Sequence, residues 1–244
     1  GIVRNRRGNS MVNYSDISFD TPIKEELEKL DIDFAFQPIY DSKTMKIHAY
    51  EALMRPKGRG PLDLIEEYQE KDELHTIEVA TCFGAMQRFR ERGYSENLSY
   101  NSLPSESLTV EEQKLFHRMH ADMHGRVVVE MVEYTKLNEL KWSIKLSEIK
   151  RRDIDIAVDD FGAGNNSFAA IDKFQADYVK IDRELLSGID GDEEKQKNLI
   201  ELVEYLHKLG VKVIAEGIET KEELDFIRST GVDYLQGYYL GRPA

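Results

Sequence analysis

The stretch Asp153–Asp182, DIDIAVDDFGAGNNSFAAIDKFQADYVKID, contains the repeating unit that decides the fold. Its apolar runs DIAVDDF and DYVKID predict two strands, and a short helix is expected between them, near Ser167–Ile171. A strand, a helix and a second strand in this order predict parallel strands with a right-handed crossover. Because both runs are almost continuously apolar, we expect both faces of these strands to be buried.

The same alternation extends along the chain in both directions. Strands are predicted at FAFQPIY, KIHAYEALM, NLSYN, RVVVEMV, VKVIAEGIE and VDYLQGYYL, and helices over Ile23–Leu30, Leu74–Phe89, Val110–His120, Leu137–Ile149, Glu194–Leu209 and Lys221–Ser229. The first two strands surround the polar turn Asp41–Lys43 and predict a hairpin, so the first strand is expected to be antiparallel. Seven or eight such units favour a closed α/β barrel over an open sheet, and no G-x-G-x-x-G follows the first strand.

Composition limits the class of protein. A chain of 244 residues suits a single barrel, so we expect one domain over residues 21–244 after a disordered leader over residues 1–20. The single cysteine, Cys82, excludes an internal disulfide and suits a reducing, cytoplasmic setting. No apolar run reaches the roughly 18–20 residues of a membrane span. The net charge of −13 argues against duplex nucleic acid as a partner, although a local group of cations could still bind a small anion.

Polar residues recur where the predicted strands end. They are Glu51, Asn101, Glu130, Asp159, Asp160, Lys180, Glu216 and Gln236. In an α/β barrel the carboxyl ends of the strands meet on one face, which carries the active site. Five close carboxylates and one lysine leave a negative charge that two divalent cations would neutralise. Oxygen ligands without nearby cysteine or histidine favour Mg²⁺ or Mn²⁺, and a pair of such ions suits phosphodiester cleavage.

The same residues lie in a set of motifs. These are QPI at Gln37–Ile39, EALMR at Glu51–Arg55, EMVE at Glu130–Glu133, DDFGAG at Asp159–Gly164, YVKID at Tyr178–Asp182, AEGIET at Ala215–Thr220 and QGYYLGRP at Gln236–Pro243. Together they resemble the EAL domain family. The resemblance implies a modified TIM (β/α)8 barrel with an antiparallel first strand. It also implies metal-dependent hydrolysis of the bacterial second messenger cyclic di-GMP to linear pGpG, with two Mg²⁺ or Mn²⁺ ions.

The resemblance also implies a role for each matching position. One ion would be held by Glu51, Asn101, Glu130 and Asp159, and the other by Asp159, Asp160 and Glu216. Lys180 would orient the attacking water and, with Glu51 and Glu216, make up the catalytic group. Gln37, Leu53 and Arg55 would hold the substrate, with Glu219 and Gln236 at the rim. Glu133 would brace the loop that follows DDFG.

Three positions depart from the family pattern. The loop at Ala163–Ser167 lacks the usual aromatic residue. This departure puts the family's mode of regulation in question more than its catalytic reaction. The segment after Asn101 reads N-S-L-P, which leaves the role of Ser102 open, and the chain stops at Ala244, where a closing helix is usual. As partners, the resemblance implies cyclic di-GMP, a second copy in a homodimer, and sensor or GGDEF domains in the same or another chain.

Two other functions remain open. The altered loop would suit a receptor that binds cyclic di-GMP without cleaving it, although no metal ligand is missing. A different Mg²⁺ barrel enzyme, such as an enolase-type proton abstractor, would need a second base, and Lys180 is the only lysine at a predicted strand end. His117, His120 and His124 lie on or just after a polar helix and are assigned to a solvated face, and DFG at Asp160–Gly162 lacks the other kinase motifs.

Overall fold

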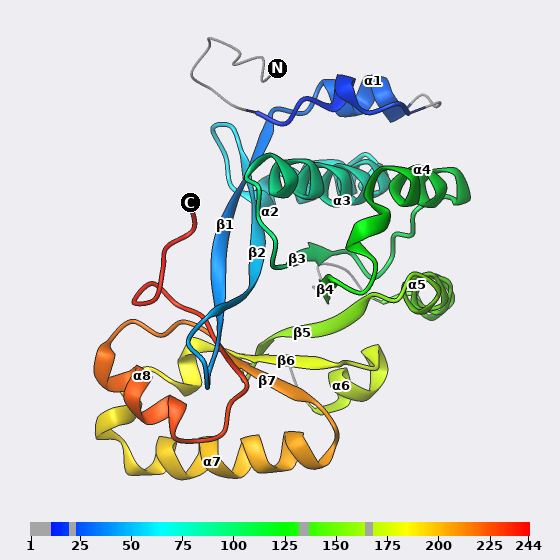
Figure 1. Cartoon of the computed structure of the whole chain (residues 1–244). Coiled ribbons are helices and arrows are strands. Elements are labelled where there is room, and N and C mark those ends of the chain that lie inside the picture. Colours follow the sequence, from blue (N-terminus) through cyan, green and yellow to red (C-terminus); the bar gives the residue numbers. More distant parts are fainter. Residues whose placement is uncertain (1–10, 20–22, 132–136, 164–167) are drawn as a thin grey trace. The chain divides into compact units, whose positions relative to one another are not determined.

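The computed structural model describes residues 11–19, 23–131, 137–163 and 168–244 (Figure 1). Within them the strands form a closed barrel in chain order. They are β1 (Ile32–Asp41), β2 (Ile47–Pro56), β3 (Asn97–Ser102), β4 (Val127–Met131), β5 (Asp155–Phe161), β6 (Tyr178–Ile181), β7 (Lys212–Ala215) and β8 (Tyr234–Leu235). Neighbouring strands from β2 to β8 are parallel, whereas β1 pairs antiparallel with β8. The predicted modified TIM barrel with an antiparallel first strand is therefore confirmed.

Helices alternate with these strands as the periodicity predicts. They are α1 (Ile23–Glu28), α2 (Pro61–Glu70), α3 (Leu74–Glu91), α4 (Val110–His120), α5 (Glu139–Arg151), α6 (Phe168–Phe174), α7 (Glu193–Lys208) and α8 (Lys221–Arg228). Helix α2 was not predicted, although Pro61 begins it and Asp63 accepts a hydrogen bond from the Gly60 N–H, both ordinary helix-start signals. Among the described residues, none of the helices combines the length and apolar character that crossing a bilayer requires.

The contacts divide the chain into two compact units. The first consists of residues 1–35, 54–94 and 108–121 and contains α1 to α4. Its core includes Tyr14, whose hydroxyl donates a hydrogen bond to the Ala80 carbonyl at 2.6 Å, and Phe83, which meets Phe19 and Phe116 edge to face. Here the structure differs from the expected leader, because residues 11–19 are packed: apolar side chains at 12, 14, 17 and 19 give this segment a buried face.

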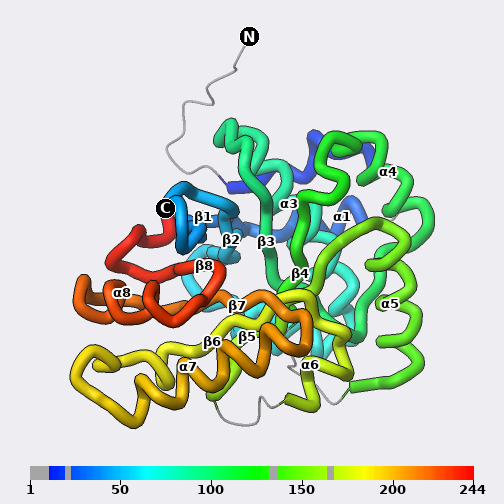
Figure 2. Tube along the Cα trace, turned by 60° about the horizontal axis from the view of Figure 1, so that its bottom comes forward, coloured from blue at the N-terminus to red at the C-terminus, as the bar shows by residue number. Residues whose placement is uncertain are grey.

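The second unit consists of residues 36–53, 95–107 and 122–244 and holds most of the barrel strands together with α5 to α8. Helix α7 lies beside β7 (Figures 1 and 2), and apolar side chains such as Leu199 and Val213 fill the space between these elements. Strands β6 and β7 are buried along most of their length, as their continuous apolar runs predict.

The last strand is shorter than predicted. The run VDYLQGYYL indicated a strand over residues 232–240, but β8 covers only Tyr234–Leu235. Beyond it the chain crosses onto the loop after β7, where Ile218 donates to the Gln236 carbonyl and accepts from the Tyr239 N–H. A side chain at Gly237 would overlap the Ile218 backbone, so only glycine permits this approach.

Candidate active site

A buried lysine gathers three of the predicted acids in the second unit. Lys180, on β6, is 0% exposed, and its Nζ lies 3.1 Å from both carboxylate oxygens of Glu51. The same Nζ lies 2.9 Å from Glu130 Oε1 and 3.4 Å from Glu216 Oε2. A fully buried ammonium group needs such partners because desolvation penalises an isolated charge. Residues 51, 130, 180 and 216, far apart in the sequence, thus meet where β2, β4, β6 and β7 converge.

Burial and neighbouring charges shift the pKa values of the groups around Lys180. Burial raises the pKa of Glu130 well above its usual range, and the charge of Glu51 adds to this. Burial likewise raises the pKa of Glu216 well above its usual range, against the opposing effect of Lys180. Burial alone would lower the pKa of Lys180, but Glu130, Glu51 and Glu216 outweigh it and raise that pKa well above its ordinary value. The site therefore holds more carboxylates than its one lysine can keep ionised.

An irregularity in β5 turns two acids toward the same region. The register with β6 shifts between Val158 and Phe161, so that Asp159 and Asp160 together face the single residue Lys180. Asp160 adopts a positive φ of 51°, and its N–H donates to Asp159 Oδ1 at 2.9 Å. Because side chains alternate along a regular strand, adjacent acids would otherwise point to opposite faces.

Two groups of oxygen atoms at this position fit divalent cations. Asp159, Asp160 and Glu216 each place a carboxylate oxygen within 4.8 Å of the other two. On the neighbouring strands, Asn101 and Glu130 are register partners, and Asn101 Oδ1 and Glu130 Oε2 are buried with no hydrogen-bond partner among the described residues. Unpartnered buried oxygens are costly in a protein interior unless a cation or water satisfies them. These ligands are carboxylate and amide oxygens, which Mg²⁺ and Mn²⁺ prefer.

Glutamine side chains connect the acids to an open pocket of about 290 Å³. Gln236 Nε2 donates to Glu51 Oε1 and to Gln37 Oε1, both at 3.0 Å. Gln37 in turn donates to the Gly241 carbonyl at 3.1 Å. Gln37, Glu51, Leu53, Glu216, Glu219 and Gln236 all line this pocket. The structure thus brings most of the predicted metal and substrate residues of this unit to one place.

Comparison with known proteins identifies the family. The sequence profile described as the EAL domain matches residues 22–243. The chain belongs to the EAL domain family. It is 29% identical over 223 residues to the probable cyclic di-GMP phosphodiesterase PdeN of Escherichia coli, covering 86% of this chain and 43% of that protein. The chain thus spans less than half the length of this curated relative.

Solved structures share the fold of this EAL domain. A standalone versatile EAL protein from Vibrio cholerae superposes with a TM-score of 0.79 at 24% identity, covering 88% of this chain and 93% of that one. BlrP1 from Klebsiella pneumoniae, in a complex with manganese and cyclic di-GMP, gives a TM-score of 0.73 at 25% identity. That match covers 87% of this chain and 56% of the BlrP1 chain.

The pocket of the EAL domain also contains residues that the sequence analysis missed. Arg183 and Tyr238 both line it. Arg183 pairs with Glu219 at 3.0 Å, donates to the Gly217 carbonyl, and lies against Gly217 so closely that a Cβ there would be 2.5 Å from Arg183 Cβ. Arg183 directly follows the predicted strand DYVKID, so the strand-end rule that selected the acids could have found it. Tyr238 lies inside the predicted strand VDYLQGYYL and follows a strand end only because β8 stops at Leu235.

Two predicted residues are not among the described residues of the second unit. Arg55 belongs to the first unit, where its guanidinium donates to the Met54 carbonyl at 3.2 Å. Glu133 lies outside the described residues, as does most of the altered loop after DDFG. Their predicted roles therefore stay predictions.

A second buried lysine gives Ser102 a role in the EAL domain. Lys145 on α5 donates to Ser102 Oγ and to the Glu106 carbonyl, both at 2.6 Å. Both side chains are almost fully buried. Ser102 follows Asn101 directly, so this contact fixes the segment that leaves β3. The unusual order N-S-L-P thus places a hydroxyl where a buried ammonium group needs an acceptor.

Replacing Lys145 with methionine is expected to lower the free energy of unfolding by about 2–3 kcal/mol. The reason is that two buried acceptors lose a charged donor. Urea denaturation monitored by circular dichroism measures the change. Lys141→Met, at an exposed position of the same helix, is the matched control and should stay within about 0.5 kcal/mol of the parent. Equal stability of the two variants would contradict the anchoring role.

Proposed function

We propose that this EAL domain hydrolyses cyclic di-GMP to linear pGpG with the help of two Mg²⁺ or Mn²⁺ ions. The observation that carries the proposal is the convergence of Lys180 with Glu51, Glu130 and Glu216 in one buried cluster. The names of two similar proteins support it, a probable cyclic di-GMP phosphodiesterase and a complex with manganese and cyclic di-GMP. Each ligand position implied by the motifs is filled by an oxygen-bearing residue.

The proposed metal ligands are those that the EAL motifs imply. Glu51, Asn101, Glu130 and Asp159 would hold one ion, and Asp159, Asp160 and Glu216 would hold the other. When bound, a pair of divalent ions activates a water molecule and offsets charge on the leaving oxygen of a phosphodiester. Asn101 Oδ1 and Glu130 Oε2, which are buried without partners among the described residues, would gain one.

The chain's own residues supply orientation and charge. Lys180 stays protonated, and its ammonium group orients the attacking water and offsets negative charge that develops on the phosphate. Water adds to phosphorus while one P–O ester bond of the ring breaks. The water gives up one proton and the leaving oxygen takes up one to become a hydroxyl, which leaves a linear dinucleotide with a terminal phosphate. Gln37, Leu53 and Arg55 would hold the substrate, with Glu219 and Gln236 at the rim, and Glu133 would brace the following loop.

The direct test is hydrolysis by metal-loaded protein. With Mn²⁺, purified protein is expected to convert cyclic di-GMP to pGpG, measured by chromatography and mass spectrometry. Excess EDTA should stop product formation, because the acids alone cannot replace the two cations, and added Mn²⁺ should restore it. Calorimetric binding of cyclic di-GMP without product would instead identify a receptor.

We also propose that the domain forms a homodimer and works with sensor or GGDEF domains, in the same polypeptide or in a partner. Leu140 and Ile144, on one side of α5, expose 72% and 56% of their surface and would be covered if a second copy packed against this helix. Light scattering at working concentration is expected to give twice the mass of 28.2 kDa. A clean monomer would contradict the dimer.

A further inference from the structure

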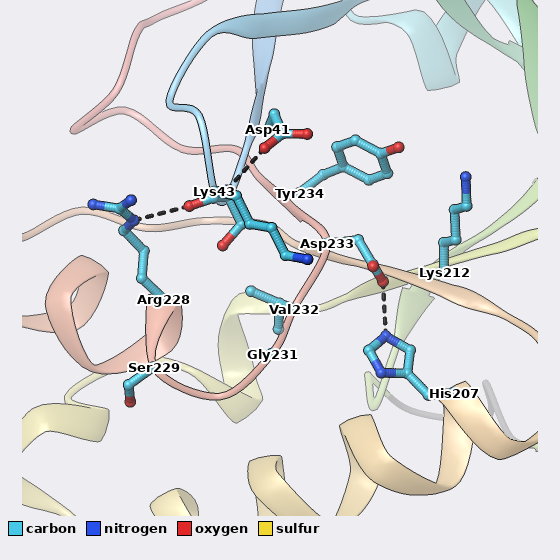
Figure 3. Close-up of a pocket in the computed structure, with 11 residues that line it drawn as sticks. Asp41, Lys43, His207, Lys212, Arg228, Ser229, Gly231, Val232, Asp233 and Tyr234 are labelled. Carbon is cyan, nitrogen blue, oxygen red and sulfur yellow. Dashed lines mark hydrogen bonds and ion pairs between the residues drawn. The ribbon is translucent and has the colours of Figure 1, made fainter.

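A second pocket in the same unit is lined by cations. It has a volume of about 850 Å³, within the range of about 300–1,000 Å³ typical of small-molecule sites (Figure 3). Its basic residues are Lys43, His207, Lys212 and Arg228, and its acidic residues are Asp41 and Asp233. They come from the end of β1, the turn between β1 and β2, the end of α7, the start of β7, the end of α8 and the residue before β8. Separate parts of the chain thus contribute positive charge to one cavity.

Both carboxylates in this pocket are already engaged. Asp41 Oδ1 accepts hydrogen bonds from the Lys43 and Thr44 N–H groups at 2.8 and 2.9 Å. Asp233 Oδ2 lies 2.8 Å from His207 Nε2 and accepts from the Val213 N–H at 2.8 Å. These contacts hold the acids to their own loops and to the barrel.

The lysine and arginine side chains of this pocket form no ion pairs with the described residues. In the part of the chain that the structure describes, Lys43, Lys212 and Arg228 have no carboxylate oxygen within 4.0 Å. Arg228 uses only Nε, which donates to the Ser42 carbonyl at 3.0 Å, so both terminal nitrogens remain available. In a chain with 46 acidic and 33 basic residues, three cations with no carboxylate at ion-pair distance around one cavity are notable. Lys212 also lies 5.9 Å from the centre of the Tyr178 ring and interacts with Asp155 over a longer distance.

Helix ends account for only part of this charge. α7 and α8 end at the pocket, and the partial negative charge of a helix C-terminus favours basic side chains there. His207 and Arg228 lie in these last turns and fit that structural role. Lys43 and Lys212 belong to neither helix, so they are a surplus of positive charge that the helices do not explain.

The positions of the cations indicate the kind of ligand. In Figure 3, Arg228 and Lys212 lie on opposite sides of the pocket, with the Lys43 side chain between them. A single small anion would contact one of them, whereas an extended anion could contact several. The guanidinium fork of Arg228 suits the oxygens of a phosphate, and lysine provides a point charge for another.

We propose that this pocket binds a small molecule carrying two or more phosphate groups. It shares no residue with the candidate active site. The two sites lie at opposite ends of the same strands: Lys212 begins β7 and Glu216 follows it, while Tyr234 begins β8 and Gln236 follows it. The strands' amino ends are the face of an α/β barrel that does not carry the catalytic site.

Isothermal titration calorimetry with pyrophosphate and with GTP tests the proposal. EDTA is present throughout, so that no divalent metal ion is left at the active site to bind the anion there. The double variant Lys43→Met, Lys212→Met is expected to weaken binding at least tenfold, and both positions are exposed, so the fold is retained. Lys208→Met, exposed at the end of α7, is the matched control and should bind like the parent.

The two probes distinguish the sources of affinity. Equal affinities for pyrophosphate and GTP would show that the phosphates alone are recognised, and tighter GTP binding would show added contacts to the nucleoside. Glu51→Gln should leave this binding unchanged, even if the proposed hydrolysis is absent, which separates the two proposals. No binding by the parent, or equal binding by the double variant and the parent, would overturn the site.

Discussion

Replacing Lys180 with methionine is expected to reduce cyclic di-GMP hydrolysis by about 10²–10³-fold, the usual loss when one preorganised electrostatic group is removed. Methionine fills a similar volume but carries no charge, so water and phosphate lose the ammonium group that would orient them. The rate of pGpG formation at saturating Mn²⁺ measures this loss. The exposed Lys197→Met on α7 is the control and should retain the parent rate.

The same substitution should also weaken the metal-free fold. Glu51 and Glu130 would keep their burial but lose their cation, and breaking a buried ion pair from one side costs about 3–5 kcal/mol. Urea denaturation in EDTA measures it. If Lys180→Met does not fold, Lys180→Arg keeps the charge but moves it, and it should fold with reduced turnover. Parent-like turnover of either variant would contradict the role of Lys180.

Glu51→Gln is expected to lower kcat/KM for cyclic di-GMP by about 10³-fold or more, equivalent to about 4 kcal/mol. Glutamine keeps the shape of the side chain but removes the negative charge that would bind a cation. Lys180 would still contact Glu130 and Glu216, so the fold should persist. Mn²⁺ titration by calorimetry should show weaker metal binding independently of turnover.

A matched substitution separates charge from position in this experiment. Glu204→Gln makes the same chemical change at an exposed position of α7 and should leave both metal binding and turnover unchanged. Glu51→Gln protein that retains parent-like turnover would show that this carboxylate is not a metal ligand.

Much of the site could be predicted because, in a barrel, a residue at the carboxyl end of a parallel strand lies on a known face. Glu51, Glu130 and Glu216 each stand at or just beyond the end of an apolar run, and parallel strands bring such ends together. Lys180 could be placed among them for the same reason. The antiparallel first strand followed from the short polar turn at Asp41–Lys43, since two strands joined so closely can only run in opposite directions.

What the sequence could not show depends on contacts between distant segments. Alternation would have sent Asp159 and Asp160 to opposite faces, and only the register shift against β6 brings them together. The early end of β8 depends on how Gly237 meets Ile218, and the position of Arg183 depends on Gly217. Neither of these close contacts produces a periodic pattern in the sequence.

The buried acids have a consequence for how long the protein survives in a cell. A cation that binds only the folded chain stabilises it by mass action, by about 2.7 kcal/mol when its free concentration is a hundred times its dissociation constant. Proteases act on the opened form, whose population falls as this stabilisation grows. If the acids bind metal as proposed, a cell short of that metal would lose the catalytic activity of the protein. It would also lose the protein itself by degradation.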